Sequence, residues 1–291
     1  MTKKILIIGG TGFLGQNLLK KLLNRGFKLY SLSSKKNKKQ FKQVKYLICN
    51  VLSRKKLKKI VNENFDIIIN LLGNIDHKKK EQNFKVHFVG LKNLYRIINK
   101  KSLKLFIQVG SCLEYGSSSS PQKERIKCSP ISHYGKVKYY VSQFIQKKLR
   151  NKSIVLRLYQ VFGPNQKNDR LIPYVIQSCK KNKKFNCTDG NQLRDFLYVD
   201  DFSDLVIKIL NRKKIYKGVY NVGYGKPLKV KSIINKIAKK IKKGKPIFGS
   251  IKMRKDEIRV LYPNIQKVKK KFNWIPKTSV EKGIIKTIKS Y

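Results

Sequence analysis

The stretch ILIIGGTGFLG, residues 5–15, decides the fold. Its four apolar residues are typical of a strand buried on both faces, and residues 16–25 continue with the 3.6-residue period of a helix. The glycines satisfy both G-x-x-G-x-x-G and G-x-G-x-x-G, which permit a tight turn and a close approach of backbone to a pyrophosphate. The free amides of the first helical turn favour phosphate groups. The stretch therefore predicts a strand, a phosphate-binding turn and a helix.

Strand-like and helix-like runs alternate over the following 150 residues. The strand-like runs are 4–8, 28–32, 66–71, 105–109 and 153–158, and the helix-like runs are 16–25, 57–64, 84–99 and 134–149. Such alternation predicts a parallel sheet with helices on both faces, and ligands at the carboxyl edge of its strands. We expect an α/β fold with a Rossmann-type doubly wound parallel sheet.

The pattern becomes less regular after Gly163, where a basic helix-like run covers residues 230–243. We interpret this part as a smaller C-terminal subdomain that binds substrate. The predicted boundaries are 1–165 with 197–222 for the dinucleotide-binding domain, and 166–196 with 223–291 for the subdomain.

The charge of the chain is strongly positive. Its 291 residues include 69 Lys and Arg against 15 Asp and Glu, a formal net charge of +54. Because 41% of the residues are hydrophobic, the chain can bury a core, which excludes a disordered basic tail. Composition alone permits nucleic acid, an anionic membrane surface or a phosphorylated small molecule as partner. The cations extend from Lys3 to Lys289, so we interpret most of them as a solvated lysine-rich surface.

Cysteine usage and hydropathy bear on the compartment. The five cysteines include no C-x-x-C pair, and no His cluster has metal-ligand spacing, so we expect reduced thiols and no metal site. Three glycines interrupt the apolar run 5–14 and no small-residue cleavage site follows, which argues against a signal peptide. No apolar run approaches the roughly 18 residues of a membrane span. We expect a cytoplasmic protein without a membrane partner.

The end of the second predicted strand bears on the choice of cofactor. Residues 29–36 read LYSLSSKK, so no carboxylate is present to bond the ribose hydroxyls of NAD. Ser33 and Lys35 instead suit a ribose 2′-phosphate, which favours NADP. NAD stays the alternative, because lysines are common throughout this chain.

Tyr134 and Lys138 form a candidate catalytic pair. Their i, i+4 spacing places a phenol and an ammonium on one face of the predicted helix. The ammonium stabilises the phenolate and lowers the phenol pKa from its ordinary value near 10, which suits acid–base chemistry. Ser111 follows the strand-like run 105–109 and lies at its carboxyl end. The Y-x-x-x-K spacing alone arises by chance in a chain so rich in Tyr and Lys.

Together with the glycine motif, these residues resemble the extended short-chain dehydrogenase/reductase family of sugar-nucleotide epimerases, dehydratases and ketoreductases. The resemblance continues in order along nearly the whole chain. Its further motifs are PISHYGKVK at 130–138, LRLYQVFGP at 156–164, RDFLYVDD at 194–201, YNVG at 220–223, Arg254 with Glu257, and Trp274-x-Pro276. This ordered series is far more specific than any single motif.

The resemblance implies roles for individual residues. Tyr134 would be the acid–base phenol, Lys138 would tune it and hold the nicotinamide ribose, and Ser111 would hydrogen-bond the sugar oxygen. The implied cofactor-binding residues are Gly9, Gly12, Phe13, Leu14, Gly15, Ser33, Lys35, Asn50, Val51, Leu71, Leu72, Gly73, Val109, Tyr134, Lys138 and Tyr159. The implied substrate-binding residues are Ser111, Cys112, Tyr134, Gln160, Arg194 and Arg254. The two arginines would grip the nucleotide diphosphate, and a surface ion pair is the alternative for each.

Departures from the family pattern reduce the number of candidate reactions. In the 4,6-dehydratases an Asp-Glu pair follows the catalytic Ser or Thr, whereas Cys112 and Leu113 occupy those places here, so we do not expect 4,6-dehydration. Glu114 lies one position too far along. His87 replaces an Asn of the family, and we interpret it as a structural group.

The leading hypothesis is an NADP-dependent reductase of a nucleotide-linked 4-keto-6-deoxy sugar in polysaccharide biosynthesis. A nucleotide-sugar 4-epimerase with retained NAD is the alternative, since it uses the same three residues. A third hypothesis is a non-catalytic protein that binds RNA or an acidic partner; it is disfavoured because the chain keeps both Tyr134 and Lys138. The resemblance also implies a homodimer through the helices at 84–99 and 134–149.

Overall fold

The computed structural model describes residues 2–37, 39–73, 80–214, 216–254 and 256–291. By their contacts the residues form two units. The first comprises Met1–Gly116, Lys127–Arg157 and Val206–Tyr220, and the second Ser117–Ile126, Leu158–Leu205 and Asn221–Tyr291. The sequence analysis assigned residues 117–126, 158–165, 197–205 and 221–222 to the dinucleotide-binding domain, whereas by their contacts they group with the second unit.

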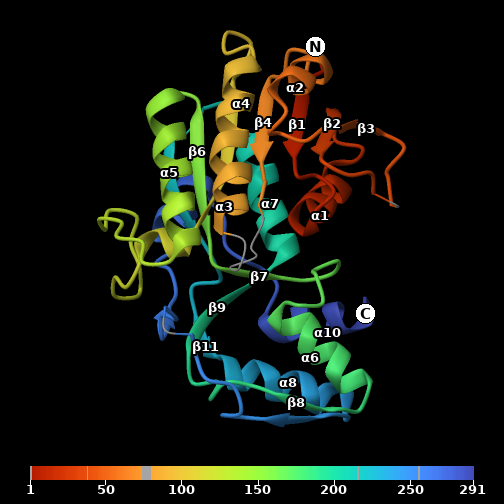
Figure 1. The fold of residues 1–291 in the computed structure, drawn as a ribbon, viewed down its shortest axis with the longest axis vertical. Helices are drawn as coiled ribbons and strands as arrows, with labels where there is room; N and C mark the ends of the chain where they lie inside the picture. Colours follow the sequence, from red (N-terminus) through yellow and green to blue (C-terminus); the bar gives the residue numbers. More distant parts are fainter. Residues whose placement is uncertain (1, 38, 74–79, 215, 255) are drawn as a thin grey trace. The chain divides into compact units, whose positions relative to one another are not determined.

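The main sheet has seven strands in the order β10-β6-β5-β4-β1-β2-β3 (Figure 1). β1 pairs in parallel with β2 and β4, β2 with β3, and β4 with β5, which confirms the predicted Rossmann-type α/β fold. The two edge strands, β3 and β10, were not predicted, because polar residues such as Lys45 and Asn221 interrupt their apolar runs. The strands are β1 (Lys4–Ile8), β2 (Lys28–Ser33), β3 (Val44–Ile48), β4 (Ile67–Asn70), β5 (Leu105–Ser111), β6 (Ser153–Leu158) and β10 (Gly218–Val222).

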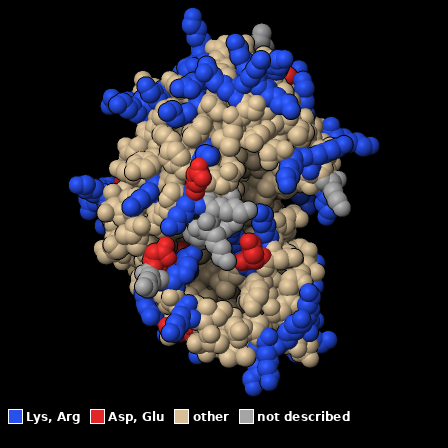
Figure 2. Space-filling model, in the orientation of Figure 1, with Lys and Arg blue, Asp and Glu red and all other residues tan. Residues whose placement is uncertain are grey.

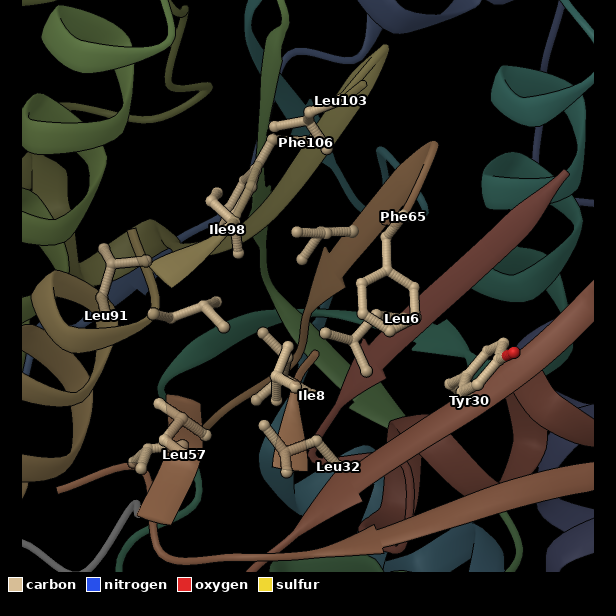
Figure 3. Packing of buried hydrophobic residues seen from close by; sticks show 14 of the residues in the cluster. Leu6, Ile8, Tyr30, Leu32, Leu57, Phe65, Leu91, Ile98, Leu103 and Phe106 are labelled. Carbon is tan, nitrogen blue, oxygen red and sulfur yellow. The ribbon is translucent and has the colours of Figure 1, made fainter. Parts of the chain in front are cut away.

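Both faces of this sheet are buried. Leu6, Ile8 and Phe106 project from one face into a cluster with Leu57 and Leu91 of the covering helices (Figure 3). Successive strand residues point to opposite faces, and the alternate residues of β1 are equally buried, so the other face is covered as well. This two-sided burial explains why the strands read as continuous apolar runs.

The helices follow the predicted order with one irregularity. The predicted helix 84–99 contains a π-helical turn, η1, which begins at Lys85 and ends at Val89. Such turns are frequent at functional sites. The helical elements are α1 (Phe13–Leu22), α2 (Arg54–Ile60), α3 (Lys80–Phe84), η1 (Lys85–Val89), α4 (Gly90–Ile97), the 3₁₀ turn η2 (Cys112–Tyr115), α5 (His133–Lys148) and α7 (Val199–Leu210).

The second unit contains a small mixed sheet and helices. β9 pairs with β7, β11 and β13, and β8 pairs with β12. The pairing of β7 with β9 groups residues after Arg157 with this unit. Its further elements are β7 (Gln160–Phe162), α6 (Leu171–Lys180), β8 (Lys184–Asn186), β9 (Leu193–Tyr198), β11 (Pro227–Lys229), α8 (Val230–Ile241), β12 (Lys245–Ile247), β13 (Val260–Leu261), α9 (Gln266–Phe272) and α10 (Val280–Lys289).

Lys and Arg are spread widely over the surface in view (Figure 2). Acidic partners are scarce enough that a single carboxylate serves two cations, as Glu63 does for Lys4 and Lys45. Among the described residues, no helix combines the length and the apolar character that crossing a bilayer requires.

Candidate active site

Two glycines of the turn after β1, Gly10 and Gly15, leave no room for a side chain. Gly9 has φ +78°, in the left-handed region that favours glycine. A Cβ on Gly15 would lie 2.4 Å from the Gly9 carbonyl oxygen, and one on Gly10 would lie 2.3 Å from Ser31 Oγ. Gly12 is the N-cap of α1 and no side chain caps the helix, so the first-turn amides remain available to phosphate. The turn therefore fits a dinucleotide pyrophosphate.

Gly15→Ala is expected to lower the free energy of unfolding by about 1–3 kcal/mol, as other overpacked sites do. Alanine would ordinarily stabilise a helical position relative to glycine, so the sign of the change tests the close contact. Urea denaturation measures it. Gly73→Ala is the control and should change stability little, because the nearest atoms to its added Cβ lie 3.7 Å away. Stabilisation by Gly15→Ala would show that the turn can open.

The end of β2 carries the hydroxyls noted in the sequence. Thr11 Oγ1 donates to Ser33 Oγ at 2.9 Å, which links the glycine turn to this strand. Lys35 is exposed just beyond. In the next loop Asn50 is exposed, and its Oδ1 accepts the amide of Leu52 at 3.0 Å. A serine and a cation therefore lie at the place where the sequence analysis expects the cofactor ribose.

Two buried amide side chains that the sequence analysis missed, Asn70 and Asn93, hold loops at the carboxyl edge of the sheet, and the buried Gln108 bonds Asn70. Asn93 Nδ2 donates to the carbonyl of Val51 at 3.1 Å. Asn70 Oδ1 accepts the amide of Leu72 at 3.1 Å, and Asn70 Nδ2 donates to Gln108 Oε1 at 2.9 Å. For Asn70 the available signal was a polar residue at the end of the apolar strand β4. These bonds order two loops that contain the predicted cofactor-binding residues Val51 and Leu72.

Lys138 is almost completely buried, with 1% of its surface exposed. Its Nζ donates to the carbonyl of Val109 on β5 at 2.6 Å. Burial lowers the pKa of Lys138 to about 8, although the negative charge of Glu114 opposes this shift. A buried ammonium thus lies next to the carboxyl end of a central strand.

Tyr134 lies one helical turn before Lys138 on α5, as the spacing predicts. Its ring packs edge-to-face on that of His87, with centroids 5.7 Å apart and an interplanar angle of 79°. The π-helical turn η1 carries this His87, which is buried. Tyr134 itself is half-buried, and the contact with the buried His87 ring restricts the motion of its phenol.

Ser111 ends β5 and caps the 3₁₀ turn η2. Its Oγ accepts the amide of Leu113 at 3.2 Å. The first turn of α5 lies against η2 so closely that a Cβ on Gly135 would come within 2.4 Å of the Leu113 carbonyl oxygen. Only glycine fits there. This contact, together with the bond from Lys138 to β5, brings Ser111, Tyr134 and Lys138 into one region of the first unit.

A buried ion pair beside this region was not predicted. Glu114 is fully buried, and its Oε2 accepts Arg157 Nε at 2.8 Å. The guanidinium of Arg157 also lies over the ring of Tyr115, 4.4 Å from its centroid. Glu114 therefore points into the protein interior. Cys112, the neighbouring predicted substrate residue, is buried in the same turn.

The remaining predicted site residues lie in the second unit. Tyr159 donates its hydroxyl to Gln122 Oε1 at 2.8 Å, and Gln160 is exposed on β7. Arg194 is buried, donates to the carbonyl of Leu193 at 2.8 Å and pairs with Glu257. Their roles toward a ligand stay predictions.

Glu257 binds both predicted diphosphate-gripping arginines. Arg254 Nη2 donates to Glu257 Oε2 at 2.6 Å, while Arg194 binds the other oxygen. Burial raises the pKa of Glu257, but the two arginines outweigh it and the net pKa is lowered. The side chain of Arg194 is therefore buried in its ion pair with Glu257, whereas the side chain of Arg254 in its pair with Glu257 is about half exposed. Among the described residues no group of three His, Cys, Asp or Glu side chains could hold a metal ion.

The chain is similar along its whole length to nucleotide-sugar enzymes. It is 26% identical to a CDP-abequose synthase of Salmonella muenchen, over 99% of this chain and 98% of that protein. It is also 26% identical to a dTDP-4-dehydro-6-deoxyglucose reductase of Escherichia coli, over 98% and 96% of the two chains.

Solved structures share the fold. The structure of the UDP-glucose 4-epimerase of Thermus thermophilus in complex with NAD matches with a TM-score of 0.89 and 19% identity, over 99% of this chain and 98% of that one. Residues 5–223 match the NAD dependent epimerase/dehydratase family, which confirms the resemblance read from the ordered motifs. The chain therefore belongs to the NAD dependent epimerase/dehydratase family.

Proposed function

We propose that the protein reduces the 4-keto group of a nucleotide-linked 6-deoxy sugar with NADPH. The observation that carries the proposal is the buried Lys138 ammonium, bonded to the end of β5 and one helical turn from Tyr134. Burial lowers the pKa of Lys138 to about 8, yet its bond to Val109 and the nearby Glu114 favour the charged form. The arrangement supports acid–base chemistry at the phenol.

Each residue of the region has a distinct task in this reaction. A bound nicotinamide dinucleotide supplies the hydride. The hydroxyl of Tyr134 donates a proton to the carbonyl oxygen, and the charge of Lys138 stabilises the phenolate that remains. Since the Oγ of Ser111 already accepts the amide of Leu113, its own hydrogen can donate to the same substrate oxygen.

The missing dehydratase carboxylates support reduction over dehydration. Cys112 and Leu113 occupy their positions, and the nearest acid, Glu114, is bonded to Arg157 in the interior. Two relatives whose names specify a CDP-linked sugar and a dTDP-linked 4-dehydro-6-deoxy sugar support a nucleotide-linked substrate. We propose that Arg194 and Arg254 bind its diphosphate.

The test combines mass spectrometry of copurifying ligands with turnover of CDP- and dTDP-linked 4-keto-6-deoxy sugars. We expect NADPH to be consumed in proportion to the sugar reduced. Tightly held NAD together with interconversion of epimers, without consumption of NADPH, would overturn the proposal in favour of a 4-epimerase. Absence of dinucleotide binding together with salt-dependent binding of arbitrary RNA would exclude both enzymes.

Lys35→Ser is expected to weaken NADPH binding about tenfold, as the loss of one charge-assisted hydrogen bond does, and to leave NADH binding unchanged. The exposed Lys35 follows Ser33 at the end of β2, where we place the 2′-phosphate. Fluorescence titration of both cofactors measures the effect. Lys28→Ser, at the opposite end of β2, is the control and should change neither affinity. Equal losses for NADPH and NADH would contradict the NADP preference.

A further inference from the structure

Glu114 is a fully buried carboxylate that the proposed reaction does not use. It belongs to η2, the turn that directly follows Ser111. A buried charge without a role is costly, because burial removes it from water. The contacts of the Glu114 carboxylate therefore indicate which role its charge has.

The two oxygens of Glu114 bind three separate elements. Oε1 accepts the backbone amide of Ser111 at 2.8 Å and the hydroxyl of Ser142 at 3.0 Å. Oε2 accepts Arg157 Nε of β6 at 2.8 Å. Ser142 lies four residues after Lys138 on α5, hence on the same face of that helix. The carboxylate thus joins the end of β5, the catalytic helix and β6 next to Lys138.

These contacts favour the charged carboxylate. An amide and a guanidinium can only donate, so both oxygens act as acceptors. Burial raises the pKa of Glu114 overall, and Arg157 and the amide of Ser111 act against that rise. The charge of Glu114 also acts on Lys138, whose pKa it raises against the effect of burial.

We propose that Glu114 is a positioning residue that keeps the Lys138 ammonium charged and holds the backbone of Ser111 in place. The assignment of Lys138 to catalysis rests on the proposed function, whereas its charge state does not. Without the carboxylate, Lys138 would share a buried region with the unpaired cation of Arg157, and its proton would be lost at lower pH.

Other titratable groups face this region. Tyr134 precedes Lys138 on α5, and His87 of η1 packs on Tyr134. Tyr115 lies against Arg157, and Arg157 also bonds the thiol of Cys128. Burial raises the pKa of Cys128, so this thiol adds little negative charge near neutral pH.

The test compares parent proteins, first the wild type and Glu114→Gln, each with and without the further substitution Lys138→Met. The difference in free energy of unfolding that Lys138→Met causes in each parent is followed from pH 6 to 10.5. In the wild type the folded protein loses the Lys138 proton near pH 8, and the unfolded chain near 10.5. Between these values the unfolded chain binds more protons, so Lys138 becomes less destabilising as pH rises. In Glu114→Gln we expect this rise to begin about one pH unit lower.

Ser142→Ala is the matched control. It removes one hydrogen bond to Glu114 and keeps the charge, so its rise should begin at the wild-type pH. If Glu114→Gln does not fold, the double variant Glu114→Gln, Arg157→Met replaces it, because it removes both buried charges. In this double variant the rise in the free-energy difference should still begin below the wild-type pH. Rises at one common pH in all these proteins would overturn the proposal.

Turnover provides the second readout. We expect Glu114→Gln to lower kcat by at least tenfold at pH 8, and Ser142→Ala to lower it much less. A shift of the Lys138 titration without any turnover in the wild type would overturn the proposed reaction and leave the role of Glu114 in the Lys138 charge intact.

Discussion

Tyr134→Phe is expected to lower kcat by about 10²–10⁴-fold, the usual contribution of a positioned acid–base group. The substitution removes one oxygen and leaves the ring, so the edge-to-face contact with His87 can persist. Dinucleotide affinity should remain within a few fold, because we place the phosphate contacts at the glycine turn and α1, away from the phenol. Steady-state kinetics with NADPH and the keto sugar, together with cofactor titration, measure both quantities.

Tyr140→Phe is the control for this variant. Tyr140 lies on the same helix but is half exposed, so removal of its hydroxyl should leave kcat unchanged. Retention of most of the wild-type rate by Tyr134→Phe would contradict the assigned proton donor. Equal losses in both variants would point to damage of the helix as a whole.

Arg157→Met is expected to lower the free energy of unfolding by about 3–5 kcal/mol, the cost of leaving one member of a buried ion pair without its partner. Glu114 would remain fully buried while its guanidinium partner is gone. The contact of Arg157 with the ring of Tyr115 would be lost as well. Urea denaturation at pH 7 measures the change.

Two variants sharpen this prediction. Glu114→Gln together with Arg157→Met removes both charges and should recover part of the stability lost in the single Arg157→Met variant. Arg259→Met breaks an exposed pair with Asp189 and should have little effect, since exposed pairs are screened by water. A loss in Arg157→Met no larger than that in Arg259→Met would show that the buried pair contributes little.

The parts of the fold that depend on residues close together in the sequence could be predicted from the sequence. β1 begins and ends at the predicted residues, and α5 places Tyr134 and Lys138 one turn apart. Strand and helix periodicities arise within a few residues, so a local pattern is enough to find them. The ordered motifs likewise identified the family to which residues 5–223 belong.

Two local features escaped this reasoning for physical reasons. The edge strand β3 pairs on one side and carries Lys45, so no continuous apolar run marks it. The π-helical turn η1 keeps the apolar pattern of a helix, and the sequence analysis expected an uninterrupted one. His87 was interpreted as structural, and the structure adds its contact with the ring of Tyr134.

The local order of residues was sufficient for the central strands of the sheet, the glycine turn and the spacing of Tyr134 and Lys138. The environment of Glu114 was decided by tertiary structure alone. Arg157 lies 43 residues away along the chain and Ser142 lies 28 away, so no local pattern connects either to Glu114. Packing of β5, β6 and α5 brings the three together and removes them from water. That burial holds the Glu114 carboxyl, one position out of register with the family motif, beside Lys138, where we propose that it stays charged.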